Sequence, residues 1–272
     1  KTEAEVETLQ RAADLTVDAH QAAMGITRPG VYEFELESII DHTFRVGGGM
    51  GPGYTTIVGG GVNATILHYI ENNAVLNDGD LVCVDAGCEY GFYTADVTRT
   101  WPVNGRFSDP QRELYELVLE AQEASIAAAV EGGSMRAVHQ ASVAVLTKGM
   151  VDLGLLKGDV DELIADESFK KYYMHGTGHW LGLDVHDVGA YYRGGESRPL
   201  EPGMVLTVEP GLYVAEDDED APEKYRGIGI RIEDDVLIVA GGNRVLTAAA
   251  AKTVEDVEAL VGSLTNAPSG SE

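Results

Sequence analysis

Cysteine is scarce in this sequence, since Cys83 and Cys88 are the only two among 272 residues. Two cysteines cannot form the disulfide framework of a small secreted domain, and their spacing lacks the Cys-x-x-Cys pattern of many zinc sites. We therefore expect reduced thiols and a cytoplasmic location. The sequence also lacks a run of about 18 apolar residues and the basic and apolar parts of a signal peptide, so no membrane partner is expected.

Positive charge is also in short supply, with 19 Lys and Arg against 45 Asp and Glu and a formal net charge of −26. Affinity for nucleic acid comes from clustered cations, so no nucleic-acid partner is expected. We interpret most of the acidic excess as a solvated surface, with adaptation to salt or a cation-rich ligand site as the alternatives. The hydrophobic fraction of 44% is ordinary for a chain that folds around a core.

Two helices followed by strands are predicted twice along the chain. Helical periodicity over residues 6–24 and 32–44 predicts one pair of helices, and capping signals with periodicity over 108–130 and 134–150 predict another. Short β-branched or apolar runs bounded by glycine predict strands at residues 55–58, 65–69, 81–84, 97–103, 204–208, 211–214 and 228–232, the last continued by 236–239. This order indicates an internal duplication of two α+β halves.

Four carboxylates lie at the ends of apolar strand runs, namely Asp85, Asp96, Glu209 and Glu233. A buried carboxylate without a partner is costly, so each of the four needs a compensating cation. Asp85 and Asp96 are separated by a stretch that fits two adjacent strands joined by a turn, which would bring both aspartates to one point.

Three of the seven histidines, His175, His179 and His186, fall within twelve positions of a glycine-rich segment. Each alone is as readily a structural histidine as a ligand, but the cluster together with four strand carboxylates favours a site. Four carboxylates would balance two divalent cations. A donor set of oxygens with one imidazole and no thiolate favours Mn, Co, Fe or Zn, and two such ions typically serve hydrolysis. The residues therefore indicate a metal hydrolase.

Six ordered segments resemble the aminopeptidase P group of the pita-bread metallopeptidase family. They are residues 66–69, 84–90, 96–100, 174–182, 207–211 and 229–234. The resemblance covers nearly the whole chain and implies an α+β pita-bread fold, in which two pseudo-symmetric halves surround a curved, mostly antiparallel sheet. It also implies a catalytic domain over residues 1–264, a polar tail over 265–272, and the absence of an N-terminal domain that family members usually carry.

The resemblance further implies roles for individual residues. Two divalent ions, typically manganese with cobalt or zinc as alternatives, would be bound by Asp85, Asp96, His179, Glu209 and Glu233. Asp96 and Glu233 would bridge the two ions. The residues implied in substrate binding are His68, His175, His186, Tyr213 and Arg231. The implied catalytic residues are Glu209, His186 and His175. For Arg231 a simple ion pair with a carboxylate, and for Tyr213 a place in the core, remain the alternatives.

The implied activity is release of the N-terminal residue from peptides with proline in second position. A metal-bridging hydroxide would attack the carbonyl before proline, Glu209 would carry a proton to the leaving imino nitrogen, and His186 would stabilise the tetrahedral intermediate. A homo-oligomer is compatible with this activity. The alternatives are prolidase, which cleaves Xaa-Pro dipeptides, and a non-catalytic pita-bread binding module.

Overall fold

The computed structural model describes residues 1–265, and its first half packs two helices against a three-stranded sheet. The elements are α1 (Glu3–Ile26), α2 (Glu33–Val46), β2 (Ile57–Gly60), β3 (Leu81–Ala86) and β6 (Val97–Pro102). The strands lie in the order β2-β3-β6. Apolar side chains that recur along the helices are buried in one core with these strands, among them Leu15, Leu36 and Phe44.

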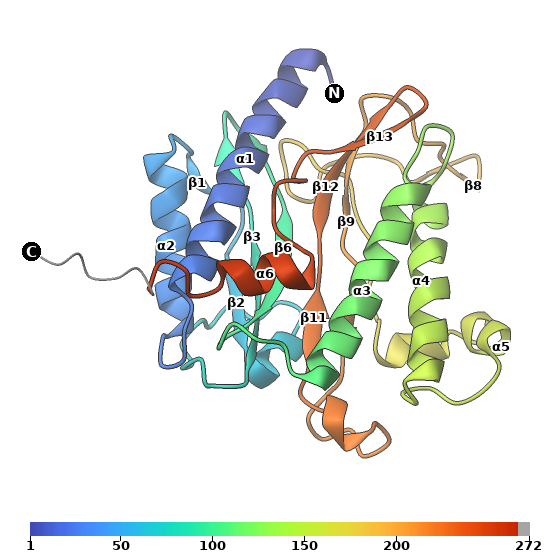
Figure 1. The fold of residues 1–272 in the computed structure, drawn as a ribbon. Helices are drawn as coiled ribbons and strands as arrows, with labels where there is room; N and C mark the ends of the chain where they lie inside the picture. Colours follow the sequence, from blue (N-terminus) through green and yellow to red (C-terminus); the bar gives the residue numbers. More distant parts are fainter. Residues whose placement is uncertain (266–272) are drawn as a thin grey trace, which may run out of the picture.

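The second half repeats this arrangement. Its elements are α3 (Asp109–Ala128), α4 (Met135–Asp152), β9 (Val205–Val208), β12 (Asp234–Val239) and β13 (Gly242–Val245). The strands again lie in chain order, β9-β12-β13, and the pairings in both three-stranded sheets are antiparallel. Figure 1 shows the pair α1 and α2 on one side of the strands and the pair α3 and α4 on the other. The predicted α+β fold with two similar halves is confirmed.

The remaining helices and strands are short, and most of them gave no signal in the sequence. They are β1 (Gly51–Pro52), η1 (Gly61–Thr65), β4 (Cys88–Tyr90), β5 (Tyr93–Thr94), α5 (Val160–Ala165), η2 (Ser168–Lys171), β7 (Tyr192–Arg193), β8 (Glu196–Ser197), β10 (Gly211–Tyr213), η3 (Glu223–Tyr225), β11 (Gly229–Arg231) and α6 (Val254–Leu260). Elements of two to seven residues are too short to show a period, so only β10 and β11 were predicted.

The strand predicted over residues 65–69 is wrong. The 3-10 helix η1 includes its first residue, and residues 66–74 contain neither helix nor strand. Ile66, within the predicted strand, does not pack in a sheet, because it is 52% exposed, and the adjacent Ile70 is 55% exposed. The backbone N–H groups of Gly60, at the end of β2, and of Ala74, at the end of residues 66–74, donate to the side chain of Glu33.

The predicted continuation of residues 228–232 into 236–239 is also wrong, because β11 and β12 are separate strands with different partners. β11 pairs with β10, whereas β12 pairs with β9. Ile232 and Glu233 lie between them, at the point where the chain leaves one pairing for the other. The acidic interruption in the apolar pattern is therefore a boundary between two strands.

A buried ion pair joins the two halves. Arg99 of β6 and Asp234 of β12 are fully buried, and Arg99 Nη2 lies 2.7 Å from Asp234 Oδ1. The same guanidinium donates to the backbone carbonyl of Glu233, and Lys252 Nζ lies 2.9 Å from Asp234 Oδ2. Burial alone would raise the pKa of Asp234, but the charges of Arg99 and Lys252 hold it below its ordinary value. Because loss of one partner would leave a buried charge unpaired, this pair fixes how β6 meets β12.

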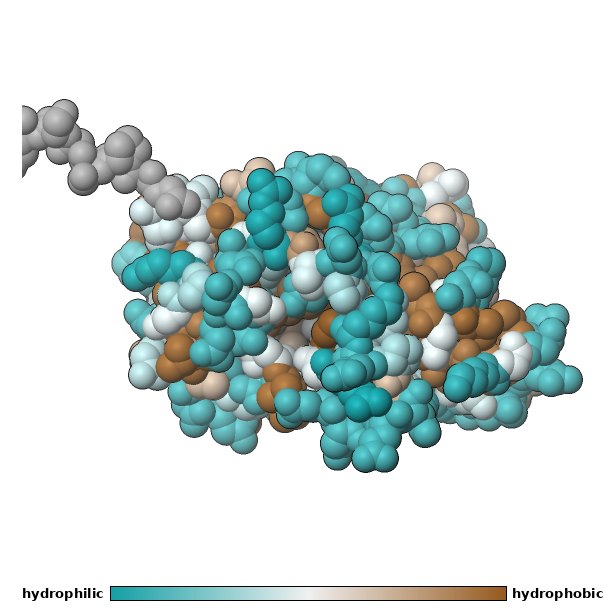
Figure 2. Space-filling model, turned by 60° about the horizontal axis from the view of Figure 1, so that its bottom comes forward, coloured by the Kyte–Doolittle hydropathy of each residue, from teal (hydrophilic) through white to brown (hydrophobic). Residues whose placement is uncertain are grey.

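The surface agrees with the acidic composition. In the view of Figure 2, hydrophilic residues cover most of the face and hydrophobic residues form separate patches between them. No helix within residues 1–265 is long and apolar enough to cross a membrane. The predicted polar tail over 265–272 lies outside the described residues from 266 onward.

Candidate metal centre

Glu209 and Glu233 come together because two pairs of strands are interrupted at the same level. Val208 is opposite Asp234 in the β9–β12 pair, and Gly211 is opposite Arg231 in the β10–β11 pair. Glu209 follows Val208, the last residue of β9, and Glu233 precedes Asp234, the first residue of β12, so the two lie across from each other in the gap. Both carboxylates therefore lie in the gap between the β9–β12 pairing and the β10–β11 pairing.

Asp85 and Asp96 are brought together by the β3–β6 pair. Asp85 is opposite Thr98, and Asp96 directly precedes the strand that begins at Val97. The short hairpin of β4 and β5 makes the connection, where the sequence predicted a simple turn. The predicted proximity of the two aspartates is thus present, and Asp96 is 5% exposed.

His179 is held beside these carboxylates by backbone contacts with β9. Its carbonyl accepts from the backbone N–H of Thr207 at 3.0 Å, and its own N–H donates to Thr207 Oγ1 at 3.1 Å. The preceding Gly178 has no room for a side chain, because a Cβ there would lie 2.0 Å from the carbonyl oxygen of Thr207. A glycine is therefore required for this segment to approach the strand.

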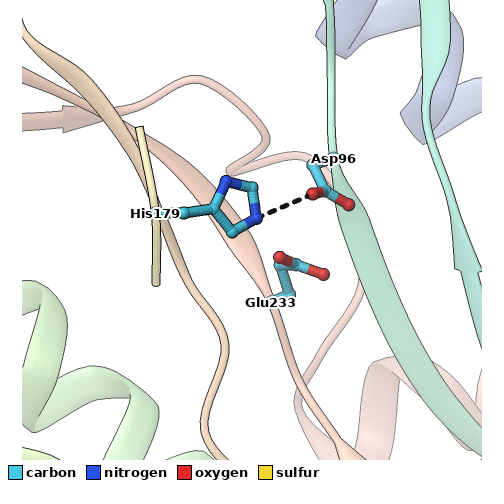
Figure 3. Close-up of side chains that lie close together, drawn as sticks. All are labelled: Asp96, His179 and Glu233. Carbon is cyan, nitrogen blue, oxygen red and sulfur yellow. Dashed lines mark ion pairs between the residues drawn. The ribbon is translucent and has the colours of Figure 1, made fainter. Parts of the chain in front are cut away.

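The donor atoms of Asp96, His179 and Glu233 all lie within 4.8 Å of one another. Figure 3 shows the imidazole directed at Asp96 with Glu233 beside them, and His179 Nε2 is 3.3 Å from Asp96 Oδ2. Glu209 Oε1 is 3.6 Å from the same nitrogen. Asp85 Oδ2 faces Arg231 Nη2 at 2.6 Å, so the predicted ion-pair alternative for Arg231 is present in the structure.

The chemistry of this donor set fits divalent metal ions. Nδ1 of His179 is 3.1 Å from the carbonyl oxygen of Trp180, to which it donates, so Nε2 is the nitrogen directed at the carboxylates. A backbone carbonyl that accepts from the other ring nitrogen commonly orients a metal-binding histidine in this way. Burial raises the pKa values of Asp96, Glu209 and Glu233, with neighbouring carboxylates adding to the shifts. Raised pKa values mean that the negative charges of this buried cluster are destabilised, and bound cations would compensate them.

Protons and metal ions are expected to compete for this cluster. Burial raises the pKa of Glu209 to about 7. Burial would lower the pKa of His179, but Asp96 and Glu209 raise it to about 9. Both residues therefore carry protons at pH 6 that metal must displace. We expect the apparent affinity for Mn²⁺ to fall about tenfold or more for each pH unit below about 7.5. Calorimetry in buffers of different ionisation enthalpy would count the protons released, and a flat pH profile would contradict the assignment.

The five carboxylate and imidazole residues face one cavity of about 490 Å³. Its lining also includes four of the five predicted substrate-binding residues, namely His68, His175, His186 and Arg231. The fifth, Tyr213, is 3% exposed and lies behind the wall of the cavity. Its hydroxyl contacts His175 Nε2 at 2.9 Å and accepts from Arg231 Nη1 at 3.1 Å.

The hydrogen bonds of His175 define its tautomer. Nδ1 lies 2.7 Å from the carbonyl oxygen of Gly176, which can only accept, so Nδ1 carries a hydrogen. Burial, assisted by the charge of Arg231, lowers the pKa of His175 to about 4. The ring is therefore neutral at pH 7, and Nε2 accepts from the hydroxyl of Tyr213. Tyr213 thus acts on the cavity by orienting His175.

Tyr54 belongs to the site although no pattern in the sequence indicated it. Its hydroxyl lies 2.6 Å from Asp85 Oδ1 and 2.5 Å from Asp96 Oδ1. Because a hydroxyl has one hydrogen, it can donate to only one of them, and the other contact needs a proton on the carboxyl group. Burial raises the pKa of Asp96, so this shared contact lies within a cluster that accepts a proton more readily than an exposed carboxylate does. A lone tyrosine in a glycine-rich stretch carries no recognisable spacing, so only the fold could reveal it.

Tyr54→Phe tests whether this hydroxyl positions the two aspartates. We expect the apparent metal affinity to fall roughly tenfold, because outer-shell partners typically contribute that much or more. Titration of the chelated variant with Mn²⁺ measures the change. Tyr115→Phe is a matched control, since Tyr115 is a buried tyrosine whose hydroxyl donates to the carbonyl of Lys252 instead. Equal metal affinity in the parent and Tyr54→Phe would remove Tyr54 from the site.

Comparison with known proteins places this geometry among metallopeptidases. The model of metallopeptidase family M24 matches residues 7–240. The chain is similar to the Xaa-Pro aminopeptidase of Escherichia coli, with 54% identity over 261 residues that cover 96% of this chain and 59% of that protein. The chain spans 50–60% of the length of the curated relatives it matches.

Solved structures show the same likeness in three dimensions. Aminopeptidase PepP of Pseudomonas aeruginosa matches with a TM-score of 0.97 and 51% identity, covering 98% of this chain and 60% of that chain. A glutamate-to-alanine variant of Escherichia coli aminopeptidase P in complex with substrate matches with a TM-score of 0.95 and 52% identity at the same coverage. These matches confirm the pita-bread fold and the resemblance found in the sequence.

Proposed function

Because the chain belongs to metallopeptidase family M24, we propose that it is a two-metal aminopeptidase that removes the N-terminal residue before proline. The observation that carries the proposal is the convergence of four carboxylates, the imidazole of His179 and three further histidines on one cavity. Relatives named Xaa-Pro aminopeptidase, at 52–54% identity over most of this chain, support the choice of substrate.

The proposed ligands of the two ions are Asp85, Asp96, His179, Glu209 and Glu233. An oxygen-rich set with one imidazole suits manganese, which we propose as the resident metal. When bound, such ions polarise the scissile carbonyl and acidify water. The chain supplies the geometry, because the β3–β6 pair and the break in the β9–β12 pair hold the ligands on rigid strands.

Glu209 is the residue best placed to carry a proton. Burial raises its pKa to about 7, so it can accept and release a proton near neutral pH. His175 Nδ1 lies 3.9 Å from Glu209 Oε2, on the side of the carboxylate turned away from His179. We propose that Glu209 takes a proton from the attacking water and delivers it to the leaving imino nitrogen.

His186 is proposed to stabilise the negative charge that develops on the carbonyl oxygen. Its ring centroid lies 4.3 Å from that of His179, and it lines the same cavity. Burial and the charge of His179 lower the pKa of His186, so its ring is neutral near pH 7 and can donate one N–H. A donor fixed in position before the charge develops contributes strongly to catalysis.

The lining of the cavity suits a proline ring. The bond before proline is a tertiary amide without an N–H, so it cannot be recognised through that hydrogen bond. Shape and apolar contact must provide recognition instead. Four apolar residues line the cavity near the histidines, namely Ile57, Leu67, Ile70 and Val185.

The cytoplasmic location is proposed from the thiols. Cys83 and Cys88 are both free and buried. Free buried thiols fit a reducing compartment.

Hydrolysis of Gly-Pro-Ala by the chelated protein, with and without added Mn²⁺, tests the function. We expect metal-dependent release of glycine and no release from Gly-Ala-Ala, the control peptide without proline. Cleavage of the dipeptide Gly-Pro but not of Gly-Pro-Ala would identify a prolidase instead. Failure to bind metal or to cleave either peptide would favour a binding module.

A further inference from the structure

Glu33 is a buried carboxylate that the proposed reaction does not use. It is the first residue of α2, and it is 0% exposed. Its two oxygens accept four hydrogen bonds from uncharged donors. Oε1 accepts from Gly60 N at 2.8 Å and Asn63 Nδ2 at 3.1 Å. Oε2 accepts from Tyr69 Oη at 2.8 Å and Ala74 N at 2.8 Å.

These four donors span the irregular stretch from Gly60 to Ala74. Gly60 ends β2 and Ala74 precedes the contact of Val75 with Tyr32, so the outer two donors mark the ends of the stretch. The backbone N–H of Glu33 also donates to the carbonyl of Ala74 at 2.9 Å. One side chain therefore ties both ends and the middle of this stretch to the start of α2.

The same stretch forms one wall of the cavity. Leu67, His68 and Ile70 line it, and Tyr69 points the other way, being 7% exposed and bonded to Glu33. No strand pairing holds residues 66–74 in place. Asn72 anchors the later part of the stretch, because its side chain bonds to the backbone of Thr56 and Val58. Next to His68, the anchored residue is Tyr69.

We propose that Glu33 is a positioning residue for His68, acting through the hydroxyl of Tyr69. The two side chains alternate across the backbone, so the bond from Tyr69 to Glu33 fixes the rotation that directs His68 into the cavity. A carboxylate is needed because all four partners are donors. A glutamine would turn its own N–H₂ group against two of them.

Tyr69→Phe removes the anchoring hydroxyl and keeps the ring, so it is the primary test. The kinetic part rests on the proposed function. We expect kcat/KM for Gly-Pro-Ala to fall about tenfold with unchanged Mn²⁺ content, because small displacements of a positioned group reduce rates by such factors. Glu33→Gln should act in the same direction.

A double-mutant cycle separates positioning from general damage. In a His68→Ala background, Tyr69→Phe should cause no further loss of kcat/KM, because the group it positions is absent. An equal loss with and without His68 would overturn the proposal. Tyr225→Phe is the matched control, since Tyr225 is a fully buried tyrosine that donates to Glu113 and does not line the cavity.

A second readout does not depend on activity. The ring Cε1–H resonance of His68 can be assigned in the NMR spectrum by its loss in His68→Ala. We expect this resonance to shift or broaden in Tyr69→Phe and to stay unchanged in Tyr225→Phe. An unchanged resonance in both Tyr69→Phe and Glu33→Gln would overturn the proposal. Failure of the parent to cleave any Xaa-Pro peptide would count against the function and would leave this measurement valid.

Discussion

Asp96→Asn is expected to lose both metal and activity. Asp96 contributes an oxygen to the compact group with His179 and Glu233, and it also contacts Tyr54. The substitution removes one negative charge and turns an acceptor into a donor within a buried cluster. We expect kcat/KM to fall on the order of 1,000-fold or more, beyond the roughly 10- to 100-fold typical of an outer-shell partner.

Metal content and hydrolysis should fall together in this variant. Both can be measured on the same sample, by elemental analysis after dialysis against Mn²⁺ and by release of glycine from Gly-Pro-Ala. Asp152→Asn is a suitable control, because the Asp152 side chain is 61% exposed and its ion pair within residues 1–265 is with Lys148, on the surface of α4. Such exposed pairs contribute little. Full activity in Asp96→Asn would show that Asp96 is not a metal ligand.

His186→Ala should separate metal binding from turnover. The ring lines the cavity beside His179 but lies outside the three-residue group of donor atoms. Its loss should leave the two ions bound and remove a hydrogen-bond donor to the developing negative charge. We expect kcat to fall roughly 100- to 1,000-fold, the range found when one such donor is removed.

The metal content of His186→Ala is the decisive comparison. We expect it to equal that of the parent, with KM changed much less than kcat. His42→Ala is the matched control, because His42 is exposed on α2 and should show parental kinetics. Loss of metal from His186→Ala would reassign the residue to the ligand set.

Much of the fold could be predicted because its main elements follow strong periods. The four long helices and the central strands show the expected repeats of apolar residues. The strand prediction for residues 65–69 failed because its apolar side chains do not pack in a sheet. Ile66 is exposed at the surface, and Leu67 lines the cavity. An apolar run this short does not show whether its side chains face a sheet, the solvent or a cavity.

The candidate site could be predicted where its residues violate a local pattern. Glu209 and Glu233 stand out because a carboxylate interrupts an apolar strand, and His175 and His179 because histidines rarely cluster. Tyr54 violates no pattern, so its contacts with Asp85 and Asp96 emerge only when strands distant in sequence are assembled. Residues that act through others leave little trace in a single sequence.

The position of the cluster on the seam between the halves has a consequence for its origin. Asp85 and Asp96 come from the first half, whereas His179, Glu209 and Glu233 come from the second. A chain of half this length would present only part of the proposed ligand set. If the two halves descend from one ancestral sequence, that ancestor would have had to associate with a second copy before it could bind two metal ions. In that case, fusion of two copies would have made this association independent of protein concentration.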